Sequence, residues 1–151
     1  MSTIGDAYDE IIAQVAATLD SGYKRLPDPL TLEENNEQFL KRGYGAVIGP
    51  MENPQRELCN RLYIRRTISV ILTNRITARD FDSVKRSDSQ AAMIADMDNV
   101  MLALHQLGLN TANVVNALTV LDDSGVTEIF VDKDNYISCS ATVLVEYKKG
   151  S

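Results

Sequence analysis

The chain has 151 residues, a formal net charge of −6 and a pI of about 4.7. This length suits a single domain, and 44% hydrophobic with 24% charged residues allow a buried core, which excludes wholesale disorder. The acidic balance excludes a general nucleic-acid binder, because such a protein needs a basic face to displace counterions from phosphates. No run of about 18 apolar residues occurs, so we expect no membrane-spanning helix.

The first predicted element is a helix from about Thr3 to Asp20. Thr3 and Asp6 have the spacing of a capping box, and Gly22 follows as a stop signal. One apolar stripe runs along this helix and consists of Ile4, Tyr8, Ile11, Ile12, Val15 and Leu19. The spacing predicts a helix that packs one side against the core.

An extended loop is predicted at about residues 21–42. Pro27 and Pro29 exclude a helix interior or a central strand there, and ordered loops of this length are often functional. The segment YGAVIGP at 44–50 then reads as a short strand that Pro50 stops.

A long strand is predicted from about Leu58 to Ile76. Its core face consists of Leu62, Ile64, Ile68, Val70 and Leu72. Its other face consists of Tyr63, Arg65, Thr67, Ser69, Ile71, Thr73 and Arg75. Arg65 and Arg75 fit a solvated sheet face or a contact with a neighbouring subunit. Arg66 has the parity of the core face, so it must leave the core near a strand end, meet a bulge, or be paired.

A charged loop, TARDFDSVKR at 77–86, precedes the strongest predicted helix, which runs from about Asp88 to Leu107. Ser87 and Gln90 have capping-box spacing before it. Its apolar side consists of Met93, Met97, Val100, Met101, Leu104 and Leu107. Filling of the core is the simplest interpretation of this stripe, and a groove for a partner is the alternative.

The last third of the chain predicts three strands, at 113–123, 126–132 and 136–148, with turns at DDSG and DKDN between them. The last strand alternates, with one face made of Ile137, Cys139, Ala141, Val143, Val145 and Tyr147. Together the elements predict an α+β fold over residues 1–151, with a mixed, mainly antiparallel sheet and helices packed on one face of a single compact domain.

The residues that carry chemistry elsewhere form no catalytic or metal-binding pattern here. His105 is the only histidine, and no serine or cysteine has a nucleophile motif around it. Cys59 and Cys139 predict buried free thiols, with a disulfide or redox pair as the alternative, and favour an intracellular protein. The turn at 132–135 lacks the glycine and glutamate of a calcium loop. We therefore expect no enzyme, no metal and no cofactor.

The element order resembles that of the tail terminator and related head–tail joining, or neck, proteins of long-tailed bacteriophages. The matching stretches are YGAVIGP, RRTISVILTNR, SQAAMIADMDNVMLALHQL and NYISCSATVLVEYK, which cover most of the chain after residue 43. The resemblance implies a non-enzymatic virion protein without a cofactor, assembled in the host cytoplasm and located at the tail or neck. It implies a homohexameric ring that caps the tail tube, joins the head connector and lets DNA pass through its lumen without specific binding.

Charged residues in the long strand and the loop after it are the candidate intersubunit or partner contacts that this resemblance implies. They are Arg65, Arg66, Arg75, Arg79, Asp80 and Asp82. A head- or tail-completion adaptor at the neck is an alternative function of the same class. A small-molecule-binding α/β regulatory domain, with a concave apolar pocket, is an alternative of another class. An enzyme would have to use His105 with an acidic partner.

Overall fold

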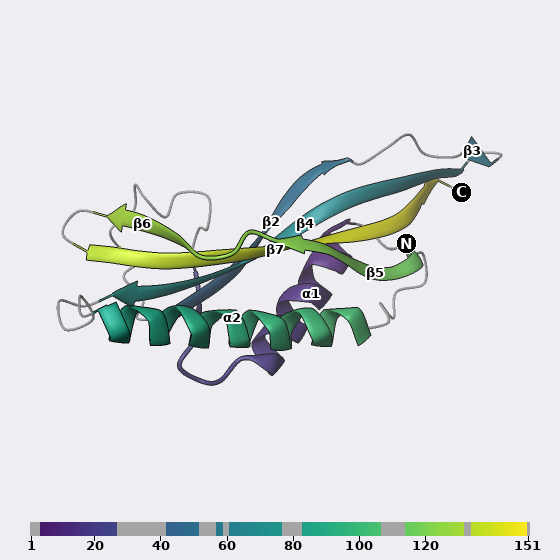
Figure 1. Cartoon of the computed structure of the whole chain (residues 1–151). Helices are drawn as coiled ribbons and strands as arrows, with labels where there is room; N and C mark the ends of the chain where they lie inside the picture. Colours follow the sequence, from purple (N-terminus) through teal and green to yellow (C-terminus); the bar gives the residue numbers. More distant parts are fainter. Residues whose placement is uncertain are drawn as a thin grey trace.

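A seven-stranded mixed sheet carries the fold, and two helices lie on one of its faces (Figure 1). The computed structural model describes residues 4–26, 42–51, 57–58, 61–76, 83–106, 114–131 and 134–150. The helices are α1 (Ile4–Thr18) and α2 (Ser83–Gln106). The strands are β1 (Lys24–Arg25), β2 (Arg42–Met51), β3 (Glu57–Leu58), β4 (Arg61–Ile76), β5 (Val114–Asp123), β6 (Thr127–Val131) and β7 (Asp134–Gly150).

The two longest strands, β4 and β7, pair antiparallel along their whole length, from Arg61 opposite Gly150 to Ile76 opposite Asn135. The main path through the sheet is β1-β2-β4-β7-β5, with β3 beside β4 and β6 beside β7. Only β1 and β2 pair in parallel among the described strands. The predicted class is confirmed: the fold is α+β with a mixed, mainly antiparallel sheet.

The strands β5 and β6 form two consecutive segments of one sheet edge. Both run antiparallel to β7, and β5 pairs with its second half while β6 pairs with its first half. They do not pair with each other, and Asp122 and Asp123 still belong to β5, so the predicted turn at DDSG is wrong. The chain instead crosses a short gap, where Ser124 N–H donates to the carbonyl of Ser140 at 2.8 Å and Gly125 adopts a φ of 67°. The reversal predicted at DKDN is confirmed by the hairpin register, which places Val131 opposite Asp134.

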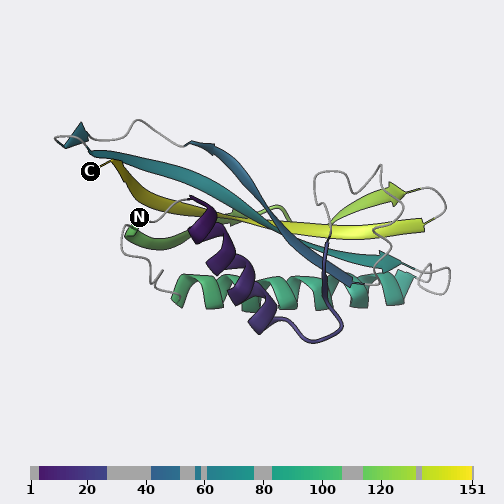
Figure 2. The same ribbon diagram turned by 180° about the vertical axis from the view of Figure 1, so that it is seen from behind.

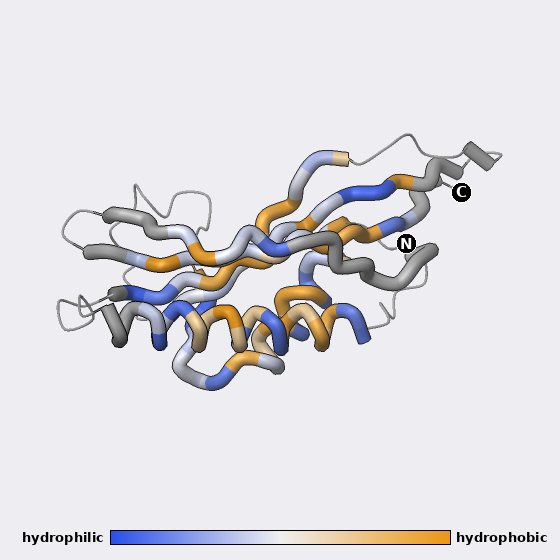
Figure 3. The backbone as a smooth tube through the Cα atoms, in the orientation of Figure 1, coloured by the Kyte–Doolittle hydropathy of each residue, from blue (hydrophilic) through white to orange (hydrophobic). Residues whose placement is uncertain are grey.

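Both helices cover the same face of the sheet, and the core lies between these layers (Figures 1 and 2). Hydrophobic stretches of the central strands meet hydrophobic turns of both helices there (Figure 3). The most completely buried members of the core are Ile11, Val15, Ile68, Val70, Leu72, Met97, Val100, Leu104, Ala141, Val143 and Val145. The predicted core faces of β7 and α1 are thus confirmed, and so are the described members of the predicted β4 face and of the Met stripe of α2, which fills the core. The side chains of Leu62 and Leu107 lie outside the described residues.

We call the opposite side of the sheet the far face, and it is buried at the end near β1. Leu26 lies there against Gly43: a Cβ on that glycine would stand 2.6 Å from Leu26 Cδ2 and 2.8 Å from Thr73 Oγ1. Leu26 and Thr73 are both buried as a result. The expected long loop therefore begins with ordered structure, while residues 27–41 lie outside the described part of the chain.

The observed helix boundaries differ from the predicted ones for local reasons. The helix α1 ends at Thr18, two residues before the predicted end at Asp20, because Asp20 accepts the Gly22 N–H at 2.8 Å and closes a turn of its own. The helix α2 begins at Ser83, so Ser87 is helical and does not cap it. Thr3, the predicted cap of α1, lies outside the described residues.

The observed strand boundaries also differ from the predicted ones, at β2 and β4 among others. The strand β2 continues through Pro50 to Met51, because a register shift between Ile48 and Met51 places the proline in an irregular stretch where its missing N–H breaks no regular ladder. The predicted long strand starts at Arg61, and Leu58 belongs to the separate short strand β3.

Candidate interaction surfaces

The far face of β4 and β7 carries polar side chains that bind one another. Arg65 Nε lies 2.7 Å from Glu146 Oε2 on the neighbouring strand. The side chain of Glu146 is 10% exposed and that of Arg65 is 41% exposed, so the carboxylate is the desolvated partner. Further along, Ser69 Oγ and Thr142 Oγ1 lie 3.3 Å apart. These cross-strand pairs give the far face a fixed polar surface.

The parity problem of Arg66 is resolved by the bulge in β2. Arg66 pairs in register with Met51, directly beyond the shift that follows Ile48. Its Nη1 donates to the carbonyl of Gly49 at 3.1 Å, and the side chain is only partly buried. Of the three predicted outcomes, the bulge and its hydrogen bond are the ones observed. The guanidinium satisfies a carbonyl that the irregular strand leaves outside the regular ladder.

An exposed apolar patch lies beside Arg66, at the end of β2. Ile48 is 43% exposed and Met51 is 48% exposed. The register places both on the helix side of the sheet, opposite Ile68 and Arg66 respectively. The end of β2 nevertheless stands away from both helices (Figures 1 and 2), so no helix covers these side chains. We call Ile48, Met51 and Arg66 the strand patch.

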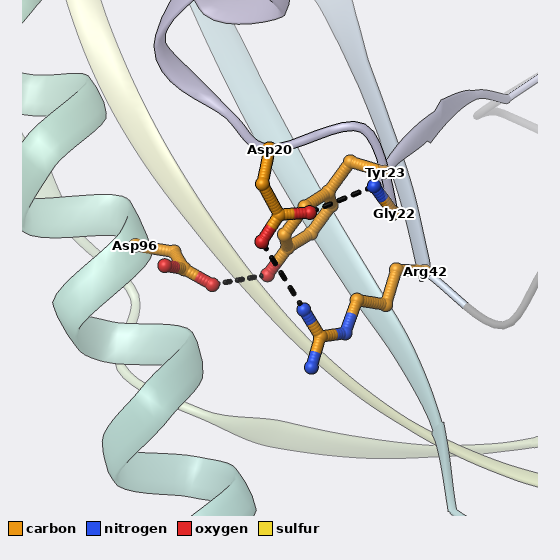
Figure 4. A network of polar contacts seen from close by, with 5 residues as sticks. All are labelled: Asp20, Gly22, Tyr23, Arg42 and Asp96. Carbon is orange, nitrogen blue, oxygen red and sulfur yellow. Dashed lines mark hydrogen bonds and ion pairs between the residues drawn. The ribbon is translucent and has the colours of Figure 1, made fainter.

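A polar network joins the end of α1, the segment before β1, the start of β2 and the middle of α2 (Figure 4). Tyr23 donates its hydroxyl hydrogen to Asp96 Oδ2 at 2.7 Å. Arg42 lies over the Tyr23 ring, 5.5 Å from its centroid, and its Nη1 is 3.5 Å from Asp20 Oδ2. Burial, together with the hydrogen bond and negative charge of Asp96, raises the pKa of Tyr23 well above its ordinary value. The phenol therefore remains a proton donor that fastens the segment before β1 to α2.

Of the other predicted contact residues, only Arg75 lies within the described part of the chain. Arg75 lies exposed near the end of β4, opposite Tyr136. Arg79, Asp80 and Asp82 lie outside the described residues. The three described residues of this set do not share one face: Arg65 and Arg75 lie on the far face of β4, and Arg66 lies on its helix side.

Reactive side chains do not converge in the described part of the chain. His105 is exposed in the last turn of α2. Cys139 is a buried free thiol, as predicted, and burial is the main cause that raises its pKa to about 12. Cys59 lies outside the described residues. Within those residues, no three His, Cys, Asp or Glu side chains are grouped so that they could hold a metal ion. No described helix is long and apolar enough to cross a membrane.

Several features were not predicted from the sequence. The Tyr23–Asp96 bond joins residues 73 positions apart, and no local pattern marks Glu146, 81 positions away, as the partner of Arg65. The strand patch contains Ile48, which the sequence presents as an ordinary strand hydrophobe, and Met51, which follows the predicted end of that strand at Pro50. The one available signal was the proline and two glycines around Ile48, which mark an irregular strand.

No protein-family model matches the sequence, and no curated protein matches it. Among solved structures, a chain from the virion of a native gene transfer agent particle is similar over 95% of this chain and 94% of its own length. The sequence identity is 15% and the TM-score is 0.48. A TM-score below 0.5 carries no functional inference, so the proposals below rest on the residues of this chain.

Proposed function

We propose that this protein is a structural virion protein: a tail terminator whose copies form a homohexameric ring that caps the tail tube and joins it to the head connector. The resemblance of its sequence pattern to that family supports the proposal, together with the element order that the structure gives from β2 to β7. The observation that carries it is the strand pair β4–β7, whose polar far face is fixed by internal pairs and which reaches past the helices (Figure 1). Such a surface suits contact with other proteins.

The charge of the chain suits a channel through which DNA passes. Six copies at −6 each would carry about −36. An acidic lumen repels phosphates, so DNA would slide through it without being held. Head-to-tail contacts around such a ring bury two different patches on every copy.

The proposal is tested by measuring the mass of the purified protein by size-exclusion chromatography with light scattering, alone and with isolated tail tubes. We expect rings, either free or formed on the tube end, and negative-stain images should show them there. A protein that stays monomeric and does not bind tubes would contradict the proposal. Position in a virion map separates a terminator from a completion adaptor at the neck, which would use the same surfaces. A regulatory domain would instead show a ligand-dependent rise in Tm.

A further inference from the structure

The edge of the sheet at β2 is closed to strand addition. Leu26 N–H donates to the Tyr44 carbonyl at 2.8 Å, so the backbone groups of Tyr44 face outward, and strand alternation turns those of Ala46 and Ile48 the same way. The Ala46 carbonyl already accepts the hydroxyl of Tyr8 at 2.9 Å. Beyond Ile48 the bulge begins and Pro50 has no N–H. One free outward residue is too short a template for another strand.

The opposite edge, at β5, is also irregular. Three register shifts interrupt its pairing with β7 between Val114 and Asp122. Bulges of this kind are a common way in which proteins keep an edge from pairing with another chain. Along β2 and β5, a contact between copies of this protein is therefore expected to use side-chain surfaces and not a continued sheet.

Two such surfaces present exposed apolar side chains, and they lie on different parts of the molecule. The first is the strand patch. The second is on the outer side of α2, where Leu102 is 55% exposed. The helix positions at heptad-like spacing before it are also exposed, and we call Ala91, Ala95, Asp98 and Leu102 the helix patch. Ile48, Met51 and Leu102 are the exposed large hydrophobic residues among those whose side chains the structure describes.

The two patches are complementary in charge. Arg66 supplies a guanidinium with five N–H groups, of which the bond to Gly49 uses one. Asp98 supplies an exposed carboxylate one turn before Leu102. The small side chains of Ala91 and Ala95 would let a neighbouring strand approach the helix closely. Since copies at −6 repel one another, an Arg–Asp pair would also fix the register of their contact.

We propose that the strand patch of one copy docks on the helix patch of a second copy, with Met51 against Leu102 and Arg66 beside Asp98. This contact rests on the proposed function, because it is the head-to-tail interface that a ring needs. Each copy would offer both halves, so the contact can repeat around the ring.

Mixing two variants tests the contact. Met51→Asp removes the strand patch and Leu102→Asp removes the helix patch, and each side chain is exposed, so the fold should survive. We expect each variant alone to be monomeric, with an apparent Kd raised at least about tenfold. An equimolar mixture should form dimers and nothing larger, because one intact contact remains between the two variants. Ala13→Asp, an equal charge change on the exposed side of α1, is the control that should assemble like the unaltered protein.

Cross-linking gives a second readout. In a Cys59→Ser background, oxidation of mixed Met51→Cys and Leu102→Cys proteins should yield a disulfide-linked dimer containing one of each, while either protein alone should yield none. Rings that form unchanged from both aspartate variants would overturn the contact and leave the proposed function standing. A native protein that neither self-associates nor joins tail tubes would overturn both.

Discussion

The two faces of the β4–β7 pair differ in how they are stabilised. On the helix side, Ile68 and Val143 lie opposite each other with no exposed surface. On the far face, Arg65 and Glu146 are joined by an ion pair, and the partly exposed Ser69 lies beside Thr142. Successive side chains of a strand point to opposite faces of the sheet, so the same two strands carry an apolar face and a polar face. The helix side supplies the hydrophobic stabilisation, and the far face offers oriented polar groups for recognition.

The far face also shows that polar residues on a sheet need not be solvated. Thr67, Thr73, Ser138 and Glu146 are buried there, although the sequence pattern favoured a solvated face or a subunit contact. Thr67 donates to the Pro50 carbonyl at 3.4 Å, and Glu146 is paired with Arg65. Burial of Thr67, Thr73 and Glu146 is tolerated because their polar groups have partners, the Gly43 carbonyl being that of Thr73 at 3.5 Å. The two faces therefore differ in what they bury: the helix side buries apolar side chains, and the far face buries polar side chains that are paired.

The largest test of this contrast is Ile68→Asp. It places an unpaired charge in the core, and we expect the free energy of unfolding to fall by about 4 kcal/mol or more, which would leave the protein largely unfolded. Ser69→Asp, one residue further on and on the far face, should cost about 1 kcal/mol. Urea denaturation followed by circular dichroism measures both. Equal losses would show that the two faces do not differ as described.

A pH series tests the burial of the helix side through Cys139. The pKa of its thiol rises from 9.0 to about 12 in the folded protein, mainly through burial. Below pH 9 the thiol is protonated in both states. Above pH 9 the unfolded chain releases this proton and the folded protein does not, so stability should fall as pH rises from 9 towards 12. The slope from this group should reach up to about 1.4 kcal/mol per pH unit.

Cys139→Ala should remove that part of the pH dependence, as measured by urea denaturation at pH 8, 9, 10 and 11. The raised pKa of Tyr23 acts in the same direction above pH 10, so some slope should persist in the Cys139 variant and decrease when Tyr23→Phe is added. Identical slopes in all three proteins would contradict the burial of both groups.

On the far face, Glu146→Ala should cost about 2 kcal/mol. It leaves Arg65 without its carboxylate, but that side chain is 41% exposed and can be hydrated, which keeps the loss below that of a fully buried pair. Arg65→Ala should lower the free energy of unfolding by more than the loss of a surface ion pair normally does, because it leaves the desolvated carboxylate of Glu146 without its partner. A double-mutant cycle of the two measures their coupling, and a coupling near zero would mean that the pair contributes nothing to stability.

The regular alternation of apolar and polar residues was enough to predict which residues form the sheet core. It was not enough to predict which strands pair with each other. The alternation of β7 and the Met stripe of α2 are local patterns, and both are confirmed. Whether DDSG reverses the chain depends on which strand β5 and β6 pair with, and a turn signal does not contain that information. The early start of α2 was missed because Ser83 to Arg86 carry no helix signal stronger than that of a charged loop.

Arg66 and Tyr23 show the same limit at the candidate sites. Parity alone identified Arg66 as the anomalous residue and named a bulge as one solution, because side-chain direction follows from position within a strand. Its acceptor, Gly49, is set by the strand register, which sequence does not give. The bond from Tyr23 to Asp96 depends on how α2 crosses the sheet, so no local pattern could indicate it.

The smallest expected effect on folding is that of Arg75→Glu. Arg75 is exposed near the end of β4, on the far face and away from the strand and helix patches. We expect the free energy of unfolding to change by about 0.5 kcal/mol or less, since exposed charges contribute little.

If the far face contacts the tail tube or the head connector, the Arg75→Glu variant should form rings normally but bind that partner more weakly, and the difference in binding should shrink as salt is raised. Co-sedimentation with tail tubes at low and high salt measures this. Unchanged binding at both would remove Arg75 from the interface and leave the fold assignment untouched, whereas a loss of stability like that of Ile68→Asp would mean that the far face is buried in the same way as the helix side.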